Sequence, residues 1–145
     1  MDSSHNPSAK ERVPWRILIV DDNPVNRKLV AAVLKNTAQC DMASNGKEAL
    51  EAYKDALREN RPYHLLLLDV AMPEIDGLQV LQRIREDEKS REIPAGKGVI
   101  IIMITAHTEP VFSAYNAGCD DYILKPLRPD ILLEKIIQKL SAREI

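Results

Sequence analysis

The sequence lacks an excess of charge of either sign. It contains 20 basic and 22 acidic residues and has a formal net charge of -2. No segment is rich in lysine or arginine, whereas chains that bind DNA or RNA usually carry a basic patch or stripe. We therefore expect no direct contact with nucleic acid.

Long apolar runs are also missing. The longest, at residues 65–68 and 99–104, are far shorter than the roughly 20 residues that a helix needs to cross a bilayer. The first residues, Met-Asp-Ser-Ser-His-Asn-Pro-Ser, contain no apolar core of a secretion signal. These absences predict a cytoplasmic protein without membrane contact.

Cysteine is scarce, because Cys40 and Cys119 are the two cysteines of the chain, and they lack the spacing of a zinc or redox motif. We expect small, partly buried thiols at both positions.

The 145 residues, 45% apolar and 29% charged, suffice for one globular core without disulfides or a structural metal. Residues 1–14 are polar and are predicted to be a disordered leader, followed by one domain over residues 15–145.

Short apolar runs and helical patterns alternate five times along the chain. Strands are expected at residues 16–20, 39–43, 64–68, 99–104 and 122–124. Helices are expected from Pro24 onward, at about 47–59, after Gly77, at about 109–117 and at about 129–142. The polar stretch 87–98 is predicted to be an exposed loop. Alternation with short connections predicts a parallel sheet covered by helices on both faces.

The spacing of apolar residues predicts which helix faces point to the core. In the first helix the predicted inward residues are Val25, Leu29 and Val33. In the last helix they are Leu132, Ile136, Ile137 and Leu140.

Polar residues follow four of the expected strands. Asp21 and Asp22 follow the first strand, and Asp69 follows the third. Thr105 follows the fourth strand and Lys125 the fifth. Because ligands of an open parallel sheet bind beyond the carboxyl ends of its strands, these side chains are expected to converge on one edge.

The expected cluster has a definite chemistry. Three crowded carboxylates repel one another, which raises their pKa values and lowers stability. A divalent cation that prefers oxygen ligands, such as Mg²⁺, removes this repulsion. Lys125 adds a positive charge and Thr105 a hydrogen-bond donor, as phosphoryl transfer requires. A carboxylate can itself be the nucleophile. Each residue alone has an ordinary explanation as a cap or loop residue, but the set favours a site.

Four motifs carry a resemblance to a known family. They are Ile-Leu-Ile-Val-Asp21-Asp22-Asn23, then Leu68-Asp69-Val-Ala-Met72-Pro73 with Asp76-Gly77, then Ile104-Thr105-Ala106, then Ala117-Gly118 through Tyr122 to Lys125-Pro126. In this order they resemble the receiver domain of two-component response regulators over about residues 16–142. The resemblance implies a flavodoxin-like α/β fold, with five parallel strands in the order 2-1-3-4-5 and five helices on both faces.

The resemblance also assigns roles. Asp69 would accept the phosphoryl group, and Thr105 and Lys125 would contact the phosphoryl oxygens. Mg²⁺ would be bound directly by the carboxylates of Asp22 and Asp69 and by the backbone carbonyl of Ala71. Asp21 would contact the ion mainly through coordinated water.

The implied partner is a protein that carries a phosphohistidine, either a sensor histidine kinase or a histidine phosphotransfer protein. The receiver would be a signalling switch that assists its own phosphorylation and dephosphorylation, and not an enzyme with external substrates. Asn26-Arg27 after the acidic pair is the style often found in hybrid kinases. The sequence leaves open whether the chain stands alone or belongs to such a kinase, and it does not identify the downstream effector.

A switch at Thr105 and Tyr122 is implied as well. Thr105 would move toward the phosphoryl group, and Tyr122 would turn inward. The outer face around the fourth helix, fifth strand and fifth helix would report the change, and a homodimer through that face is open. The alternative for Tyr122 is ordinary packing in a core.

Two further functions are alternatives to the receiver. A magnesium-dependent phosphohydrolase with an aspartyl nucleophile typically has a second aspartate two residues later, where this sequence has Ala71. A receiver fold that only binds partners is disfavoured by the intact acidic set.

The stretch 92–98 is longer than the family pattern and is expected to be a neutral surface insertion or, alternatively, a partner contact. His107 is expected to be solvated and not catalytic.

Overall fold

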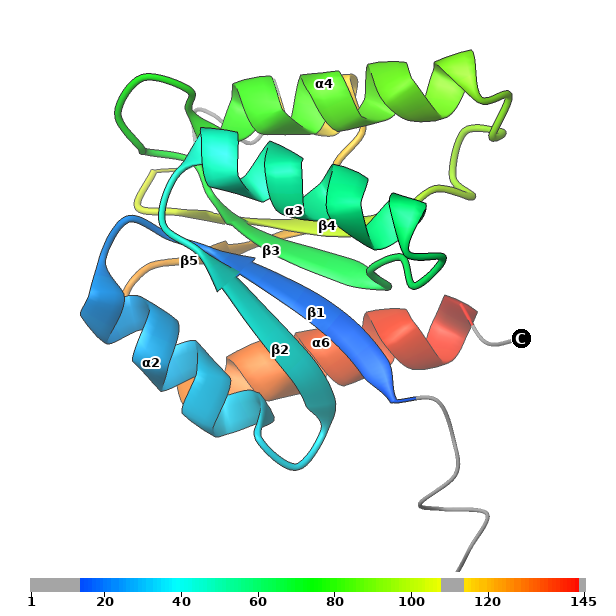
Figure 1. Ribbon diagram of the computed structural model, residues 1–145. Helices are drawn as coiled ribbons and strands as arrows, with labels where there is room; N and C mark the ends of the chain where they lie inside the picture. Colours follow the sequence, from blue (N-terminus) through cyan, green and yellow to red (C-terminus); the bar gives the residue numbers. More distant parts are fainter. Residues whose placement is uncertain (1–13, 108–113, 144–145) are drawn as a thin grey trace, which may run out of the picture.

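The computed structural model describes residues 14–107 and 114–143 of the chain. Five parallel strands form one sheet in the order β2-β1-β3-β4-β5 (Figure 1). This order confirms the predicted flavodoxin-like topology. The strands are β1 (Trp15–Val20), β2 (Ala38–Ala43), β3 (Leu65–Asp69), β4 (Ile100–Thr105) and β5 (Asp121–Leu124).

Helices cover both faces of the sheet (Figure 1). One face carries α2 (Pro24–Leu34) and α6 (Pro129–Arg143), and the other carries α3 (Gly46–Arg58) and α4 (Gly77–Ser90). Residues 114–117 are helical, and Ala114 packs into the core on the α3 and α4 side. The rest of the predicted helix at 109–117 lies largely outside the described residues, as does nearly all of the predicted leader.

The central strands are covered on both sides. Every residue of β3 and β4 is buried, as is typical of parallel strands between two helical layers. Their alternating side chains divide the apolar core into two clusters, one on each face of the sheet. No helix among the described residues is long and apolar enough to cross a membrane.

Polar caps start the helices next to the strand ends. The Asn23 side chain accepts a hydrogen bond from the Val25 N–H at the start of α2, as asparagine commonly does at this position. Asp76 and Gln79 form a capping box at the start of α4. The next residue, Gly77, has to be glycine, because a Cβ atom there would lie 2.2 Å from the carbonyl oxygen of Asp69. The beginning of α4 is therefore packed directly against the end of β3.

The predicted inward face of the first helix is wrong at Val25, whereas the predicted Leu29 and Val33 are half-buried and Val33 packs against the core. Val25 is 71% exposed, whereas Val30 and Leu34 are buried. The most buried stripe runs through the half-buried Asn26 and the buried Val30 and Leu34, which are spaced four residues apart. Its first member is polar and contacts the functional site, so the apolar pattern alone placed the stripe incorrectly.

Two more predictions need correction. The helix α4 continues through Asp87 to Ser90, where an exposed loop was expected. Glu88 within this turn is buried, because its carboxylate accepts the Val99 N–H at 2.7 Å and bonds Arg85 at 2.8 Å. In α6, Ile136 is fully buried but Ile137 is 38% exposed.

The neighbours Ile136 and Ile137 provide a matched test of the packing. Ile136→Ala should lower the free energy of unfolding by about 2–5 kcal/mol, because it leaves a cavity in the core. Ile137→Ala should lower it by less than about 1 kcal/mol, because much of its side chain stays in water. Chemical denaturation of the two variants measures both values, and equal losses would contradict this orientation of α6.

Candidate functional site

Three carboxylates converge at the carboxyl ends of β1 and β3. One oxygen from each of Asp21, Asp22 and Asp69 lies within 4.8 Å of the others. Asp21 and Asp69 are 2% and 1% exposed, and Asp22 is exposed. Because Val20 of β1 pairs with Leu68 of β3, the two residues that follow lie side by side. The predicted acidic cluster is therefore present.

Lys125 follows β5, two strands away from β3, and its side chain reaches the carboxylate cluster. Its Nζ lies 3.1 Å from Oδ1 of Asp69. Its backbone N–H donates to the Thr105 carbonyl at 2.8 Å, which ties it to the end of β4. The same Oδ1 accepts the Ala71 N–H at 3.3 Å. Oδ2 of Asp69 is buried and has no hydrogen-bond partner within the described part of the chain.

Thr105 lies at the predicted edge, but its hydroxyl is held by its own loop. The hydroxyl donates to the His107 carbonyl at 2.9 Å and accepts the His107 N–H at 3.1 Å. Thr105 is 4% exposed, and the His107 side chain is exposed. To contact a phosphoryl oxygen, the Thr105 hydroxyl would have to give up its hydrogen bonds to the His107 backbone.

Tyr122 lies one strand over, on β5, where it pairs in register with Met103 of β4. Alternation along β4 puts Thr105 on the same face of the sheet as Met103 and Tyr122. The half-buried Tyr122 ring meets the Tyr115 ring edge-on at 6.1 Å, and Lys135 Nζ lies 5.7 Å from its centre. The structure therefore brings the two predicted switch residues to one face.

The electrostatic environment of Asp69 is unfavourable for its charge. Burial and the nearby Asp21 carboxylate raise the pKa of Asp69, while Lys125 and the Ala71 N–H partly oppose this effect. The balance is a pKa above the usual aspartate range. The charged site is thus under-compensated by the groups of this chain alone.

Three residues of the loop and helix after β1 hold Asp21 in place. The Asn23 N–H and the Asn26 side-chain amide donate to its carboxylate, at 2.8 Å and 3.3 Å. Arg27 donates to its backbone carbonyl at 2.7 Å. The sequence motifs gave no role at the site to Asn26 or Arg27. Their position on the first turn of the helix after the acidic pair is the signal that could have indicated one.

The donor set fits a hard divalent cation. All three side chains offer carboxylate oxygens, which Mg²⁺ prefers. The orphaned Oδ2 of Asp69 is a buried acceptor for which the described residues supply no donor. The exposed Asp22 keeps one side of the cluster open to water, as Mg²⁺ requires because it retains several of its waters.

Comparison with known proteins agrees with this geometry. The sequence matches the family described as the response regulator receiver domain over residues 17–137. The chain belongs to this family. It is a receiver domain of two-component signal transduction, a family of signalling switches.

The receiver is similar to proteins of several architectures. It is 35% identical over 133 residues to the response regulator Rre1 of Synechocystis sp., with 90% of this chain and 53% of that protein aligned. It is 33% identical over 132 residues to the hybrid signal transduction histidine kinase I of Dictyostelium discoideum, with 89% of this chain and 7% of that protein aligned. The chain thus spans about half of one relative and a small part of the other.

A solved structure with the same fold comes from a signalling complex. This is the co-crystal structure of the Saccharomyces cerevisiae histidine phosphotransfer signaling protein Ypd1 and the receiver domain of its downstream response regulator Ssk1. The match has a TM-score of 0.79 and 27% identity, and it covers 91% of this chain and 92% of that chain.

The raised pKa of Asp69 predicts a pH-dependent stability. A carboxyl whose pKa is higher in the folded chain destabilises the fold above that pKa, and the penalty fades as pH falls toward the unfolded value of about 3.9. In metal-free buffer, Asp69→Asn should therefore be more stable than the wild type at pH 7. The gap should narrow toward about pH 4, where aspartate protonates.

Chemical denaturation across this pH range measures the gap. Asp22→Asn is the matched control, and its effect at pH 7 should be smaller because Asp22 is exposed. A destabilised Asp69→Asn at pH 7 would contradict the electrostatic interpretation.

The contact between Asn26 and Asp21 predicts a second effect. Asn26→Ala should weaken Mg²⁺ binding roughly tenfold, because removing a partner that orients a metal ligand typically costs at least that much. Titration calorimetry with MgCl₂ measures the affinity directly. The control is Asn36→Ala, since Asn36 is exposed beyond the end of α2. An unchanged affinity in Asn26→Ala would show that Asp21 needs no such support.

Proposed function

We propose that this receiver accepts a phosphoryl group on the Asp69 carboxylate and acts as a switch in a two-component phosphorelay. One observation carries the proposal. Asp69 is a buried carboxylate with Oδ1 paired to Lys125 and Oδ2 without a partner among the described residues, next to two more carboxylates. A residue placed only for stability would have its buried oxygens satisfied.

The pairing of Asp69 suggests how the transfer proceeds. Lys125 and the Ala71 N–H hold Oδ1 and so fix the plane of the carboxylate. Oδ2 then attacks the phosphorus atom of a phosphohistidine. As the new O–P bond forms, the P–N bond breaks and its electron pair returns to the imidazole nitrogen. The product is an acyl phosphate on Asp69, and Lys125 neutralises part of its charge.

Asp21, Asp22, Asp69 and the backbone carbonyl of Ala71 would hold Mg²⁺. When bound, the ion neutralises charge on the carboxylates and on the phosphoryl oxygens. Asn23, Asn26 and Arg27 keep Asp21 in position for this task.

The proposed phosphoryl donor is a sensor histidine kinase or a histidine phosphotransfer protein. The relative from Dictyostelium discoideum is by its name a hybrid histidine kinase. The structurally similar chain comes from a complex that contains the phosphotransfer protein Ypd1. Both support a histidine-bound donor for this chain.

We also propose the cytoplasm as the compartment, supported by two free thiols, Cys40 and Cys119, whose pKa values burial raises to about 11.

The switch proposed for this receiver starts at Thr105. Its hydroxyl would leave the His107 backbone for a phosphoryl oxygen, and Tyr122 would turn toward the space behind it. The reporting surface would comprise the helix that ends at residue 117, β5 and α6. The exposed apolar side chains on this surface suit a downstream partner or a second copy, and they are Tyr115, Leu124, Ile131 and Ile137.

Turnover of external phosphate esters is the rival function. An aspartyl phosphohydrolase needs an acid near the leaving group, and Ala71 occupies the position two residues after Asp69. The receiver would therefore promote only its own phosphorylation and dephosphorylation.

Phosphorylation by a small acyl phosphate tests the proposal. The wild type with Mg²⁺ and acetyl phosphate should gain one acid-stable, base-labile phosphoryl group, detected by intact-mass spectrometry. Asp69→Asn should gain none, and Asp76→Asn, which alters a nearby helix cap, is the matched control that should still be labelled. Undiminished labelling of Asp69→Asn would refute the assignment of the acceptor. Steady release of phosphate from ordinary phosphomonoesters would instead support the hydrolase.

A further inference from the structure

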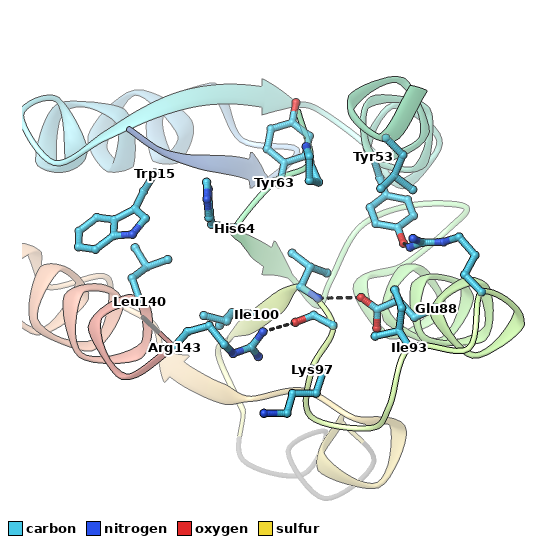
Figure 2. Close-up of a pocket in the computed structure, with 15 residues that line it drawn as sticks. Trp15, Tyr53, Tyr63, His64, Glu88, Ile93, Lys97, Ile100, Leu140 and Arg143 are labelled. Carbon is cyan, nitrogen blue, oxygen red and sulfur yellow. Dashed lines mark hydrogen bonds between the residues drawn. The ribbon is translucent and has the colours of Figure 1, made fainter. Parts of the chain in front are cut away.

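We propose that a pocket at the amino-terminal edge of the sheet, opposite to the Asp69 site, binds a small organic anion with an apolar body. The pocket has a volume of about 370 Å³ and lies where β1 and β4 begin, at Trp15 and Ile100 (Figure 2). This volume falls within the roughly 300–1,000 Å³ of small-molecule sites. None of its lining residues belongs to the phosphoryl-transfer site.

The walls of the pocket are mostly apolar and aromatic. Rings from three parts of the sequence surround one space: Trp15, Tyr53, and the adjacent Tyr63 and His64 (Figure 2). Aliphatic side chains fill the gaps between them, namely Leu57, Ile93, Ile100 and Leu140. Such walls favour a ligand with a flat or branched apolar body, because its apolar surface leaves water on binding.

The charged groups of the lining favour an anion. Three cationic side chains line the pocket: Arg91, Lys97 and Arg143. Arg91 is paired with Asp87 at 3.0 Å, whereas Lys97 and Arg143 have no carboxylate partner among the described residues. The one carboxylate in the lining is that of Glu88, and it is buried and already compensated by the Val99 N–H and Arg85. The Lys97 side chain is exposed and forms no hydrogen bond or ion pair with another described residue. A ligand carboxylate therefore meets excess positive charge at this opening.

The outer wall is the 92–98 segment, for which the sequence left a neutral insertion and a partner contact as alternatives. Ile93, Lys97 and Gly98 of this segment line the pocket. Two backbone hydrogen bonds shape this segment. The Ile93 N–H donates to the Glu88 carbonyl and the Lys97 N–H donates to the Pro94 carbonyl, each at 3.0 Å. It thus builds a concave surface instead of a featureless loop.

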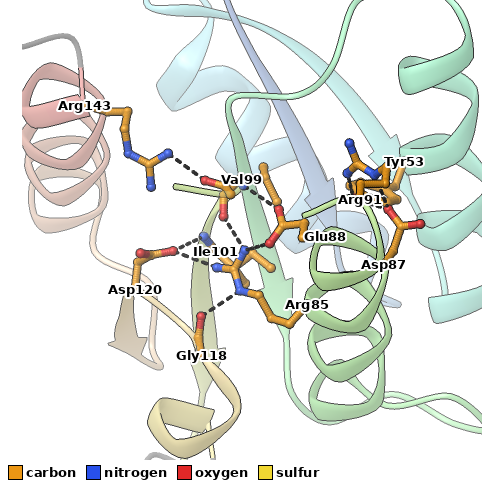
Figure 3. A network of polar contacts seen from close by, with 11 residues as sticks. Tyr53, Arg85, Asp87, Glu88, Arg91, Val99, Ile101, Gly118, Asp120 and Arg143 are labelled. Atoms are coloured by element: carbon orange, nitrogen blue, oxygen red, sulfur yellow. Dashed lines mark hydrogen bonds and ion pairs between the residues drawn. The ribbon is translucent and has the colours of Figure 1, made fainter. Parts of the chain in front are cut away.

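A network of polar contacts fixes this wall in place (Figure 3). Arg143 donates to the Gly98 carbonyl at 2.6 Å. Arg85 donates to the Val99 and Gly118 carbonyls and pairs with Glu88 and Asp120. Gly98 has no room for a side chain, because a Cβ atom there would lie 2.0 Å from the Glu88 carboxylate. The pocket is therefore preformed, which lowers the cost of binding.

The volume of the pocket and its apolar walls favour a small molecule as the occupant. A single aromatic or branched carboxylic acid would place its ring among the four rings of the lining and its carboxylate toward Lys97 and Arg143. The chain offers a direct reporter of this binding, because Trp15 in the wall is its one tryptophan.

Fluorescence of Trp15 in the full chain tests the proposal, with three ligands of equal size and different charge. Phenylacetate should give a saturable change, phenylacetamide should bind more weakly, and phenethylamine should not bind in the millimolar range. No saturable change with phenylacetate would overturn the site. Equal affinities for the acid and the amine would overturn its selectivity for anions.

Variants show whether the signal comes from this pocket. Lys97→Gln should weaken phenylacetate binding about two- to fivefold, as loss of one partly exposed charge pair does. Ile93→Phe should abolish binding by filling the space, with a cooperative unfolding transition retained. Lys54→Gln is the control, because Lys54 is an exposed residue of α3 outside the pocket. Wild-type affinity in both Lys97→Gln and Ile93→Phe would overturn the proposal.

Discussion

The buried carboxylates of Asp21 and Asp69 lie side by side at the ends of adjacent parallel strands. Each carries a charge that the other opposes, and burial removes most of the water that would screen the repulsion. Lys125 supplies one positive charge, but only to Oδ1 of Asp69. This crowding favours binding of a cation by the cluster and calls for supports that keep the carboxylates in place.

The surrounding fold is organised around this constraint. The strand order places β1 beside β3 and leaves β4 between β3 and β5. Carboxylate oxygens of Asp21 and Asp69 therefore lie within 4.8 Å of each other, while Lys125 reaches Asp69 from the end of β5. Gly77 lets α4 begin directly against the backbone of Asp69. The amino-terminal edge of the same sheet has the opposite character, with cations and aromatic rings around a cavity. The two edges are thus suited to different ligands.

Much of this arrangement was predictable because the apolar strands are short and their ends are visible in the sequence. The residue after each strand could therefore be assigned to one edge, and Asp21, Asp69, Thr105 and Lys125 do lie there. The start of the inward stripe of α2 was not predictable, since its first member, Asn26, is polar and donates a hydrogen bond to Asp21. The extension of α4 was missed because Glu88 is buried by partners, Arg85 and Val99, that only the tertiary structure brings near. The wall formed by residues 92–98 depends on the same contacts.

The dependence of stability on Mg²⁺ tests most directly whether carboxylate crowding at Asp69 is relieved by a cation. The measurement is the free energy of unfolding of the wild type and of Asp69→Asn across a series of MgCl₂ concentrations. A cation that binds only the folded site should stabilise the wild type by about 2.7 kcal/mol at about 100 times its Kd. The account predicts this rise in the wild type and a much smaller rise in Asp69→Asn. An equal rise in both proteins, or none in the wild type, would contradict it.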